Sequence, residues 1–447
     1  MTQIKRISSD KISEDQLNPP NQRSIPPHWS WVKLGDVCEP PQYGYTTSAS
    51  NNGNLKFLRT TDITSGQIDW DLVPFCKVNP KEIDKYLLKE NDVVISRAGS
   101  VGYSLLLSKP QRAVFASYLI RFRPKTNPKF FALFLQSPQY WNQISEKKLG
   151  IAVPNVNAKK LMDINFPLPP LPEQKKIVEK IEELFSQLDS GVASLKKAKE
   201  QIRLYRQSVL AAAFSGRLTG QVGSGQLAVG KSEISKAAEP KTPYSNQLPE
   251  GWKWVKLGEI TTKLGDGLHG TPKYSNDGEY YFINGNNLSD GRIEIKSDTK
   301  RVTTEEFEKY KKTLKNRTVL VSINGTLGKT AFYNGEKIIL GKSACYFNLI
   351  DNISKQYIRY FIKSQLFNNY ANKVATGSTI KNVSLKAMRE LEIPLPPSEE
   401  MQLQIVSEIE KRFSEADNLE KAIDESLAKA EKLRQSILKQ AFEGKLV

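Results

Sequence analysis

The amino-acid sequence predicts an α+β protein: two tandem β-rich α+β domains, separated by a long antiparallel two-helix coiled coil and related as a pseudo-twofold internal repeat. The first observation is the repeat itself, since IPPHWSWVKLGDV at 25–37 returns as LPEGWKWVKLGEI at 248–260. The second is that helical spacing of apolar residues follows each copy of PLPP, at 167–170 and 394–397. The third is that both copies end alike, in FSGRL and FEGKL.

The chain of 447 residues divides into six predicted segments. We expect a polar N-terminal arm, then each domain followed by its long helix, with a Gly/Ser/Lys-rich flexible linker returning the chain to the second domain. The predicted segments are the arm at 1–24, the first domain at 25–170, the first spacer helix at 171–218, the linker at 219–247, the second domain at 248–397 and the second spacer helix at 398–447.

Within each domain, short apolar runs broken by Gly, Pro and Asn predict strands. LKFLRTTDI and DVVISRAG in the first copy are examples, and VVISRAGSVG at 93–102 is matched by VLVSINGTLG at 319–328. The spacing changes to a helical one at 127–144 and again at 355–373. Each domain is therefore predicted to pack at least one helix on its sheet.

The two segments after PLPP have apolar residues at alternating spacings of three and four, which is typical of a coiled-coil seam. Prolines before and FxG after each segment mark where the helix starts and stops. About 40 residues at about 1.5 Å per residue give a rod of roughly 60 Å, longer than one DNA turn of roughly 34 Å. We expect the helices to pair and hold the domains at a fixed distance; the alternative is that each binds only a partner's helices. The predicted helix–helix or partner-contact residues are Ile177, Ile181, Leu184, Leu188, Leu195, Ile202, Tyr205, Val209, Ile405, Ile409, Leu419, Ile423, Leu433 and Ile437.

The net charge of +17 points to a polyanionic partner. The helical segments contribute little, since Glu173–Ala212 has eight Lys/Arg against six Asp/Glu and Glu399–Phe442 has seven against ten. The positive charge therefore belongs to the globular parts, where phosphate contacts would orient a duplex. The alternative is that dispersed lysines serve solubility alone.

Metal, disulfide and membrane chemistry are not indicated. The three cysteines Cys38, Cys76 and Cys345 lie far apart without CxxC, so we expect buried free thiols and no metal site. With only His28 and His269 in the chain, imidazole-based catalysis is not expected. No apolar run approaches the roughly 20 residues of a membrane span, so we expect a cytoplasmic protein without membrane contact.

Two stretches resemble catalytic motifs but depart from them. At 323–330 a phosphate loop would need glycine where Ile323 stands, and Tyr103 replaces its lysine in the other copy. NPPN at 18–21 has Asn21 in place of the aromatic residue that stacks on a flipped base in amino-methyltransferases. We therefore expect no catalytic residues.

The remaining polar and aromatic loop residues are suited to base readout. Arg can bind guanine through two hydrogen bonds and Asn can do the same for adenine, although Gly/Asn/Thr clusters are also ordinary turns. The candidate DNA-binding residues are Tyr43, Tyr45, Thr46, Arg59, Thr60 and Arg97 in the first copy and His269, Thr271, Lys273, Tyr274, Asn284, Asn286, Asn324 and Lys329 in the second.

Taken together, the PLPPxxEQ helix start, the FxG[KR]L helix end, the LPxGWxWVKLG domain start and the repeat resemble the specificity subunits of type I restriction-modification systems. The resemblance runs from Ile25 to Val447 and implies two target-recognition domains that each read one half of a bipartite double-stranded DNA target. It also implies that the paired helices set the gap and dock two methyltransferase subunits, with restriction-translocase subunits where the system has them. The chain itself would be a non-catalytic subunit without a cofactor, and S-adenosylmethionine, ATP and magnesium would be bound by those partners.

Two departures from the repeat stand beside this resemblance. The second copy starts its helix with PLPPSEEMQLQ, one residue longer before the shared Ile-Val than PLPPLPEQKK, and the arm at 1–24 has no counterpart. Two other functions stay open: a coiled-coil scaffold that binds DNA regardless of sequence, and a methyltransferase with its own recognition domains.

Overall fold

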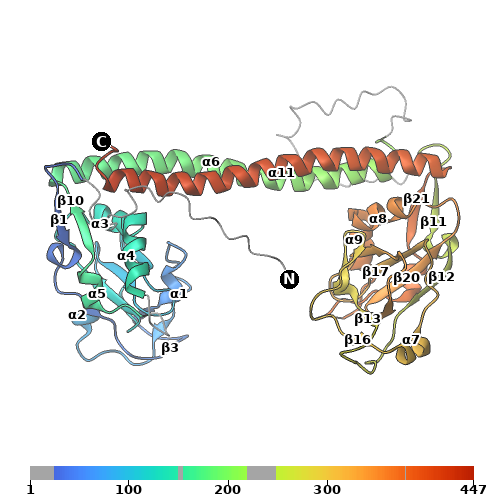
Figure 1. Cartoon of the computed structure of the whole chain (residues 1–447), viewed down its shortest axis with the longest axis horizontal. Coiled ribbons are helices and arrows are strands. Elements are labelled where there is room, and N and C mark those ends of the chain that lie inside the picture. The colour runs from blue at the N-terminus through green and yellow to red at the C-terminus, as the bar shows by residue number, and fades with distance from the viewer. Residues whose placement is uncertain (1–24, 149–154, 219–247, 378) are drawn as a thin grey trace, which may run out of the picture. The chain divides into compact units, whose positions relative to one another are not determined.

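The computed structural model describes residues 25–148, 155–218, 248–377 and 379–447 (Figure 1). The predicted arm and linker, at 1–24 and 219–247, lie outside the described residues. The chain forms two compact units, one of residues 1–194 with 425–447 and one of residues 195–424. None of the helices in the described part combines the length and the apolarity that a membrane crossing requires.

Unit 1 contains two four-stranded sheets and a separate two-stranded ribbon. The first sheet is antiparallel, and the second has one parallel pair, β4 with β8. The first sheet has the order β2 (Gln42–Tyr43), β9 (Leu119–Phe122), β6 (Val93–Ser96), β7 (Ser104–Leu106); the second has the order β3 (Ala49–Ser50), β5 (Phe75–Cys76), β4 (Lys56–Leu58), β8 (Ala113–Phe115); and the ribbon is β1 (Ser30–Lys33) with β10 (Asn165–Leu168).

The helices of this domain lie between its strands in sequence. They are η3 (Leu34–Val37), α1 (Thr60–Ile63), α2 (Ile83–Tyr86), α3 (Pro128–Phe134), α4 (Pro138–Lys148) and α5 (Ala158–Met162). Helix α3 begins where the Asn127 side chain accepts hydrogen bonds from two backbone N–H groups and Pro128 takes the first helical position. Its buried Phe130 and Phe134 pack edge-to-face on Phe166 of β10, which fixes the helix over the core.

Unit 2 repeats the same scaffold, and most of its connections have lengths similar to those of unit 1. Its four-stranded antiparallel sheet β12, β20, β17, β18 matches β2, β9, β6, β7, and its parallel pair β13 with β19 matches β4 with β8. Its strands are β11 (Lys253–Lys256), β12 (Thr261–Asp266), β13 (Tyr280–Ile283), β14 (Leu288–Ser289), β15 (Arg292–Ile293), β16 (Arg301–Val302), β17 (Thr318–Ser322), β18 (Thr330–Phe332), β19 (Ile338–Leu340), β20 (Ala344–Leu349) and β21 (Glu392–Leu395). Its helices are η5 (Leu257–Ile260), η6 (Gly285–Asn287), α7 (Thr304–Tyr310), α8 (Lys355–Lys363), α9 (Gln365–Val374) and α10 (Leu385–Arg389).

The two long helices are α6 (Leu171–Phe214) and α11 (Glu399–Phe442), of 44 residues each. They lie side by side in each unit (Figure 1). The ion pairs show that they run antiparallel, since a residue further along α6 pairs with a residue earlier in α11. In unit 1, Asp189 pairs with Arg434; in unit 2, Lys199 pairs with Asp424 at 2.7 Å. The predicted fold class, mixed helix-and-sheet domains with a long helix between them in the chain, is confirmed.

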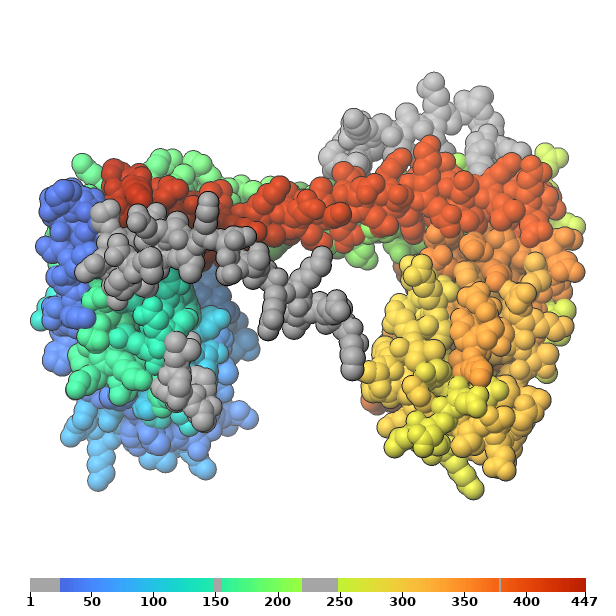
Figure 2. Space-filling model, in the orientation of Figure 1, coloured from blue at the N-terminus to red at the C-terminus, as the bar shows by residue number. Residues whose placement is uncertain are grey.

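Most of the predicted apolar positions on the two long helices are buried or half-buried, several of them in the domain cores. Ile177, Ile181, Ile202, Val209, Ile405, Ile409 and Ile437 are buried, and Leu184, Leu188, Leu195, Tyr205 and Ile423 are half-buried. Leu419 and Leu433 are instead 58% and 51% exposed, so in the isolated chain neither lies in the contact between the two helices, and a partner contact at either stays a prediction. The contacting face passes one residue further along the helix, at Glu420 and Arg434, whose long side chains pair across to α6. The uncovered face of α11 in unit 2 is visible in Figure 2.

The far end of each long helix closes the core of the other copy's domain. Phe442 of α11 lies in unit 1, with its ring 5.1 Å from that of Phe130. Phe214 of α6 lies in unit 2, with its ring 5.2 Å from that of Tyr357. The glycines that follow pack as closely, since a Cβ on Gly444 would lie 2.2 Å from Pro26 and one on Gly216 would lie 2.1 Å from Pro249. In unit 1 the FxG motif that ends α11 therefore contacts the IPP motif, and in unit 2 the FxG motif that ends α6 contacts the LPE motif.

A buried glutamine ties the start of each long helix to its own domain. In unit 1 the Gln174 carboxamide accepts from Asn127 N–H at 3.1 Å and donates to Pro169 O at 2.8 Å. In unit 2 Gln402 accepts from Ser354 N–H at 2.8 Å and donates to Asn352 O at 3.1 Å. Both glutamines lie three residues before the shared Ile-Val, so the extra residue of the second copy is accommodated before Gln402.

Candidate nucleic-acid interface

Both domains carry the same exposed hairpin turn, formed by the matched segments 97–103 and 323–329. Gly99 and Gly325 at the two tips have φ of 74° and 75°, a conformation that glycine adopts without strain. No atom of the described residues lies within 4 Å of the Cβ position of either glycine, so both tips face open space. This backbone requirement explains why the turn is matched while the connections around it differ.

At the base of the turn in unit 1, Arg97 lies over the ring of Tyr43. The guanidinium carbon is 5.1 Å from the ring centroid, which is a cation–π contact. Arg97 Nε donates to Asn155 Oδ1 at 3.5 Å, and the Tyr43 hydroxyl accepts from Ala158 N–H at 2.8 Å. Among the described residues no hydrogen bond uses the Nη atoms of Arg97, so this predicted pair keeps donors for a ligand.

Tyr45 and Thr46 continue the chain beyond Tyr43. Tyr45 is half-buried, with its N–H donating to Phe115 O at 2.7 Å and its ring 5.4 Å from that of Tyr86. Thr46 is exposed. Tyr45 therefore supports the loop, and Thr46 is the residue of the two that faces solvent.

Arg59 is held inside its own domain. Its Nε and Nη2 donate to the two oxygens of the Asp62 carboxylate at 3.1 and 2.8 Å, and the Asp62 oxygen Oδ2 also accepts from Arg59 N–H at 2.8 Å. The hydrogen bonds that Arg59 donates to Asp62 raise the pKa of its guanidinium. The Thr60 hydroxyl is buried and lacks a hydrogen-bond partner among the described residues. Base contact by Arg59 would require it to leave Asp62, so in the structure its fork stabilises the start of α1.

In unit 2 four predicted residues share one connection, between β12 and β13. His269 is 72% exposed, and its Nε2 is 2.7 Å from Asp266 Oδ2. Thr271 and Lys273 have exposed side chains, and Lys273 N–H donates to Glu306 Oε1 at 2.9 Å. Tyr274 is also exposed, with its ring 5.9 Å from that of Phe282. The structure therefore brings these four together on one solvent-facing loop.

The predicted asparagines of unit 2 are used differently. Asn284 Oδ1 accepts from the Ser343 hydroxyl at 3.0 Å, which holds its side chain between two strand ends. Asn286 is exposed on the same turn. Asn324 Nδ2 donates to Asn382 Oδ1 at 3.3 Å beside the matched hairpin turn. Of the three, Asn286 is the one whose side chain faces solvent.

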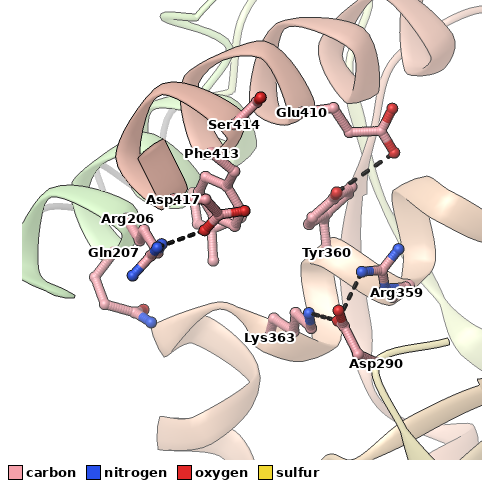
Figure 3. A pocket seen from close by; sticks show the side chains of 11 residues that line it. Arg206, Gln207, Asp290, Arg359, Tyr360, Lys363, Glu410, Phe413, Ser414 and Asp417 are labelled. Atoms are coloured by element: carbon pink, nitrogen blue, oxygen red, sulfur yellow. Dashed lines mark hydrogen bonds and ion pairs between the residues drawn. The ribbon is translucent and has the colours of Figure 1, made fainter. Parts of the chain in front are cut away.

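Lys329 lies beside a shallow hollow of about 380 Å³ that Lys363 also lines. A second hollow in unit 2, of about 420 Å³, lies between the long helices and α8 (Figure 3). Its cations are neutralised within the hollow: Arg206 pairs with Asp417, and Arg359 and Lys363 both contact Asp290. A hollow with such balanced charges has no excess attraction for phosphate.

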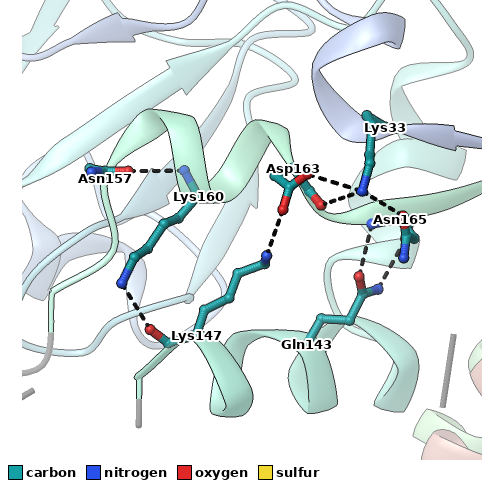
Figure 4. A network of polar contacts seen from close by, with 7 residues as sticks. All are labelled: Lys33, Gln143, Lys147, Asn157, Lys160, Asp163 and Asn165. Carbon is teal, nitrogen blue, oxygen red and sulfur yellow. Dashed lines mark hydrogen bonds and ion pairs between the residues drawn. The ribbon is translucent and has the colours of Figure 1, made fainter. Parts of the chain in front are cut away.

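One polar network in unit 1 was not predicted (Figure 4). Asp163 accepts from Lys33 at 3.0 Å and from Lys147 at 3.1 Å. The hydrogen bond from Lys33, followed by that from Lys147, lowers the pKa of the Asp163 carboxyl group. Gln143 Nε2 donates to Asn165 O at 3.0 Å, which joins α4 to β10. The repeat was a usable sequence signal, because Lys33 and Lys256 stand at matched positions in VKLG, and Asp163 and Glu390 both stand two residues before the matched strands β10 and β21. Lys256 and Glu390 form the same ion pair at 2.5 Å in unit 2.

The cysteines are free and buried, as predicted. Burial raises the pKa of the Cys38 thiol to about 12 and that of Cys76 to about 11, so neither thiol forms a thiolate near neutral pH. No cluster of His, Cys, Asp and Glu suited to a metal ion occurs among the residues that the structure describes.

Comparison with known proteins gives one consistent family. A family model described as the type I restriction modification DNA specificity domain matches residues 26–203 and again 249–429. The specificity subunit of the type I restriction enzyme EcoBI from Escherichia coli is 27% identical over 433 residues, covering 94% of this chain and 87% of that protein. The EcoKI specificity subunit from E. coli strain K12 is 28% identical over 405 residues, covering 88% and 82%.

Solved structures show the same fold. A chain from a structure that addresses complex assembly and conformational transition of the type I R-M system superposes with a TM-score of 0.68 at 22% identity, covering 94% of this chain and 99% of that chain. The HsdS subunit from Thermoanaerobacter tengcongensis gives a TM-score of 0.52 at 21% identity, covering 95% and 99%.

Proposed function

The chain belongs to the family of type I restriction-modification DNA specificity subunits, and we propose that each of its domains reads one half of an asymmetric bipartite DNA target. The contrast between a shared scaffold and unlike loops supports this proposal. The first domain presents Arg97 on Tyr43 and an exposed Thr46. The second presents His269, Thr271 and the residues that follow on the equivalent connection, whose sequence differs. Two unlike loop sets on one scaffold are suited to two unlike half-sites.

The charge of the domains supports DNA as the ligand. Residues 25–170 contain 18 Lys/Arg against 11 Asp/Glu, and residues 248–397 contain 23 against 15. Such an excess favours phosphate contacts, which position a duplex without reading its bases. Sequence would then be read by loop residues, of which we propose the half-buried Arg97 and the exposed His269 and Asn286 as base contacts.

We further propose that the chemistry belongs to partner subunits. Two methyltransferase subunits would bind S-adenosylmethionine and methylate adenine, and restriction-translocase subunits, where the system has them, would use ATP and magnesium. The paired long helices would set the gap between half-sites and offer docking surfaces.

The test is to co-express the chain with the methyltransferase subunit encoded beside it and to map adenine methylation across the host genome by single-molecule sequencing. We expect a split motif with a fixed gap that disappears when the chain is omitted. Exchange of one domain should change one half of the motif only. Methylation that persists without the chain, or DNA binding that is equal for all sequences, would contradict the proposal; the second result would favour the sequence-independent scaffold.

A further inference from the structure

Each domain begins with two tryptophans that have opposite surroundings. Trp29 and Trp252 are 5% and 8% exposed and belong to the cores. Trp31 and Trp254, two residues later, are 38% and 41% exposed. Partial exposure of an indole leaves apolar surface in water, which the fold itself does not require. The same exposure at the same position in both copies needs a reason that both copies share.

This pair stands apart from the other exposed large hydrophobic residues among the described positions. Tyr118 is 62% exposed, but serine stands at the equivalent place, three residues after β19. Leu171 has Glu399 as its equivalent, and Leu403 has Lys175. Only the exposed tryptophans have an exposed large hydrophobic residue as an equivalent within the described residues. Their exposure therefore follows the shared frame of the repeat and not the differing loops.

The surroundings of the two indoles are also matched. Trp31 is opposite Pro167 in the ribbon of β1 and β10, and Trp254 is opposite Pro394 in the ribbon of β11 and β21. The residue two positions on, which alternation places on the same face of the strand, is a lysine in both ribbons. Lys33 pairs with Asp163 at 3.0 Å (Figure 4), and Lys256 pairs with Glu390 at 2.5 Å. We define the ribbon patches as Trp31 with the Lys33–Asp163 pair and Trp254 with the Lys256–Glu390 pair.

The chemistry of the ribbon patches does not suit DNA. A half-site read by one domain differs from that read by the other, so base contacts are expected to diverge. The phosphate backbone is common to both half-sites, but binding it requires cations that can replace its counterions. In each ribbon patch the lysine already has a carboxylate partner, and the largest exposed group is an apolar ring. An indole beside an ion pair is instead typical of the anchor residues of protein interfaces.

We propose that the two ribbon patches are equivalent docking sites, each for one copy of the same protein partner, the methyltransferase subunit. This inference rests on the proposed function for the identity of the partner. A partner that binds twice must find the same surface twice, and the ribbon patches provide it on domains whose other exposed apolar residues differ. Each indole enters an apolar pocket of the partner, and the ion pair forms part of the polar rim.

The first experiment measures stoichiometry in the assembled complex by native mass spectrometry. The chain co-expressed with its methyltransferase subunit should bind two copies, and Trp31→Ala or Trp254→Ala should each weaken one copy by about tenfold or more. The double variant should lose both copies at the same concentration. Tyr118→Ala and Ile295→Ala, which remove exposed residues without matched equivalents, are the controls and should retain two copies. Two copies bound to the double variant with unchanged affinity would overturn the proposal.

A second experiment uses no substitution and therefore does not depend on how the variants fold. Oxidative footprinting of the wild-type chain should show that Trp31 and Trp254 are both protected when the methyltransferase subunit is added. Unchanged oxidation of both indoles in a complex that contains two copies would refute the inference. In that case a split methylation motif would still support the proposed function, whereas the absence of any motif would count against the function itself.

Discussion

Phe442→Ala should destabilise the first domain, although Phe442 is far in sequence from residues 25–170 that form it. Phe442 is 1% exposed, and its ring centroid lies 5.1 Å from that of Phe130 and 5.4 Å from that of Phe134. Deleting a buried phenylalanine side chain typically costs about 3–5 kcal/mol. For a domain of about 150 residues, each kcal/mol lowers the melting temperature by about 2–4 °C, so the expected shift is roughly 6–20 °C.

Hydrogen–deuterium exchange measured by mass spectrometry can assign that loss to a domain. Phe442→Ala should raise exchange in residues 25–170, and the matched variant Phe214→Ala should raise it in residues 248–397, where its ring lies 5.3 Å from that of Phe361. Leu433→Ala, an exposed position on the same helix, is the control and should change stability by less than about 0.5 kcal/mol. If Phe442→Ala left residues 25–170 as protected as before, the cross-copy closure of the core would be refuted.

Three further outcomes are expected. Gln174→Ala and Gln402→Ala should each cost about 1–3 kcal/mol, because each leaves buried backbone groups without a partner; amide exchange at the start of α3 or α8 checks this, and unchanged protection would contradict it. Asp163 has a lowered pKa, so it adds stability above its unfolded pKa of about 4 and loses that contribution as the pH falls through the lower folded value. The difference in melting temperature between the wild type and Asp163→Asn should therefore be small, since the carboxylate is exposed, but present at pH 7 and reduced as the pH falls below about 4; a constant difference would argue against the ion pairs as its cause. Lys273→Ala should weaken DNA binding by a similar factor for all sequences and reduce the slope of log affinity against log salt by about one, whereas a loss confined to one target would make Lys273 a base contact.

Repetition and periodicity carried the fold prediction. The matched starts and ends, and the change to helical spacing after PLPP, were enough to predict two α+β domains and two long helices. It was harder to predict which face of the second helix makes the contact. Leu419 and Leu433 follow Ala416 and Ala430 by three residues, whereas Glu420 and Arg434 follow them by four, and both spacings fit a helix–helix contact. Apolar character favoured the leucines, but long charged side chains can line a helix contact and pair across it.

Candidate site residues were harder to predict, because a residue type does not reveal its partner. The guanidinium of Arg59 is suited to guanine, yet Asp62 occupies that group through two hydrogen bonds. The spacing of three residues between them was an available signal, since acidic side chains often accept from the backbone at a helix start. The contact of Arg97 with Tyr43 had no such signal, because it joins the turn after β6 to strand β2, which only the fold brings together.

The packing of the helix ends bears on how the domains could be exchanged. The interiors have diverged: Asp92 pairs with Arg123 at 2.8 Å in the first domain, whereas Thr318 donates to Asn348 at 2.5 Å at the equivalent place in the second. Each of these networks lies within one domain and would move with it. The helix ends lie outside the domains in sequence, but both keep Phe, Gly and Leu at the same spacing. A domain moved to the other position would therefore meet an end that fits it, so exchanges at the PLPP motifs should fold, and a misfolded chimera would mean that the ends are specific to their domains.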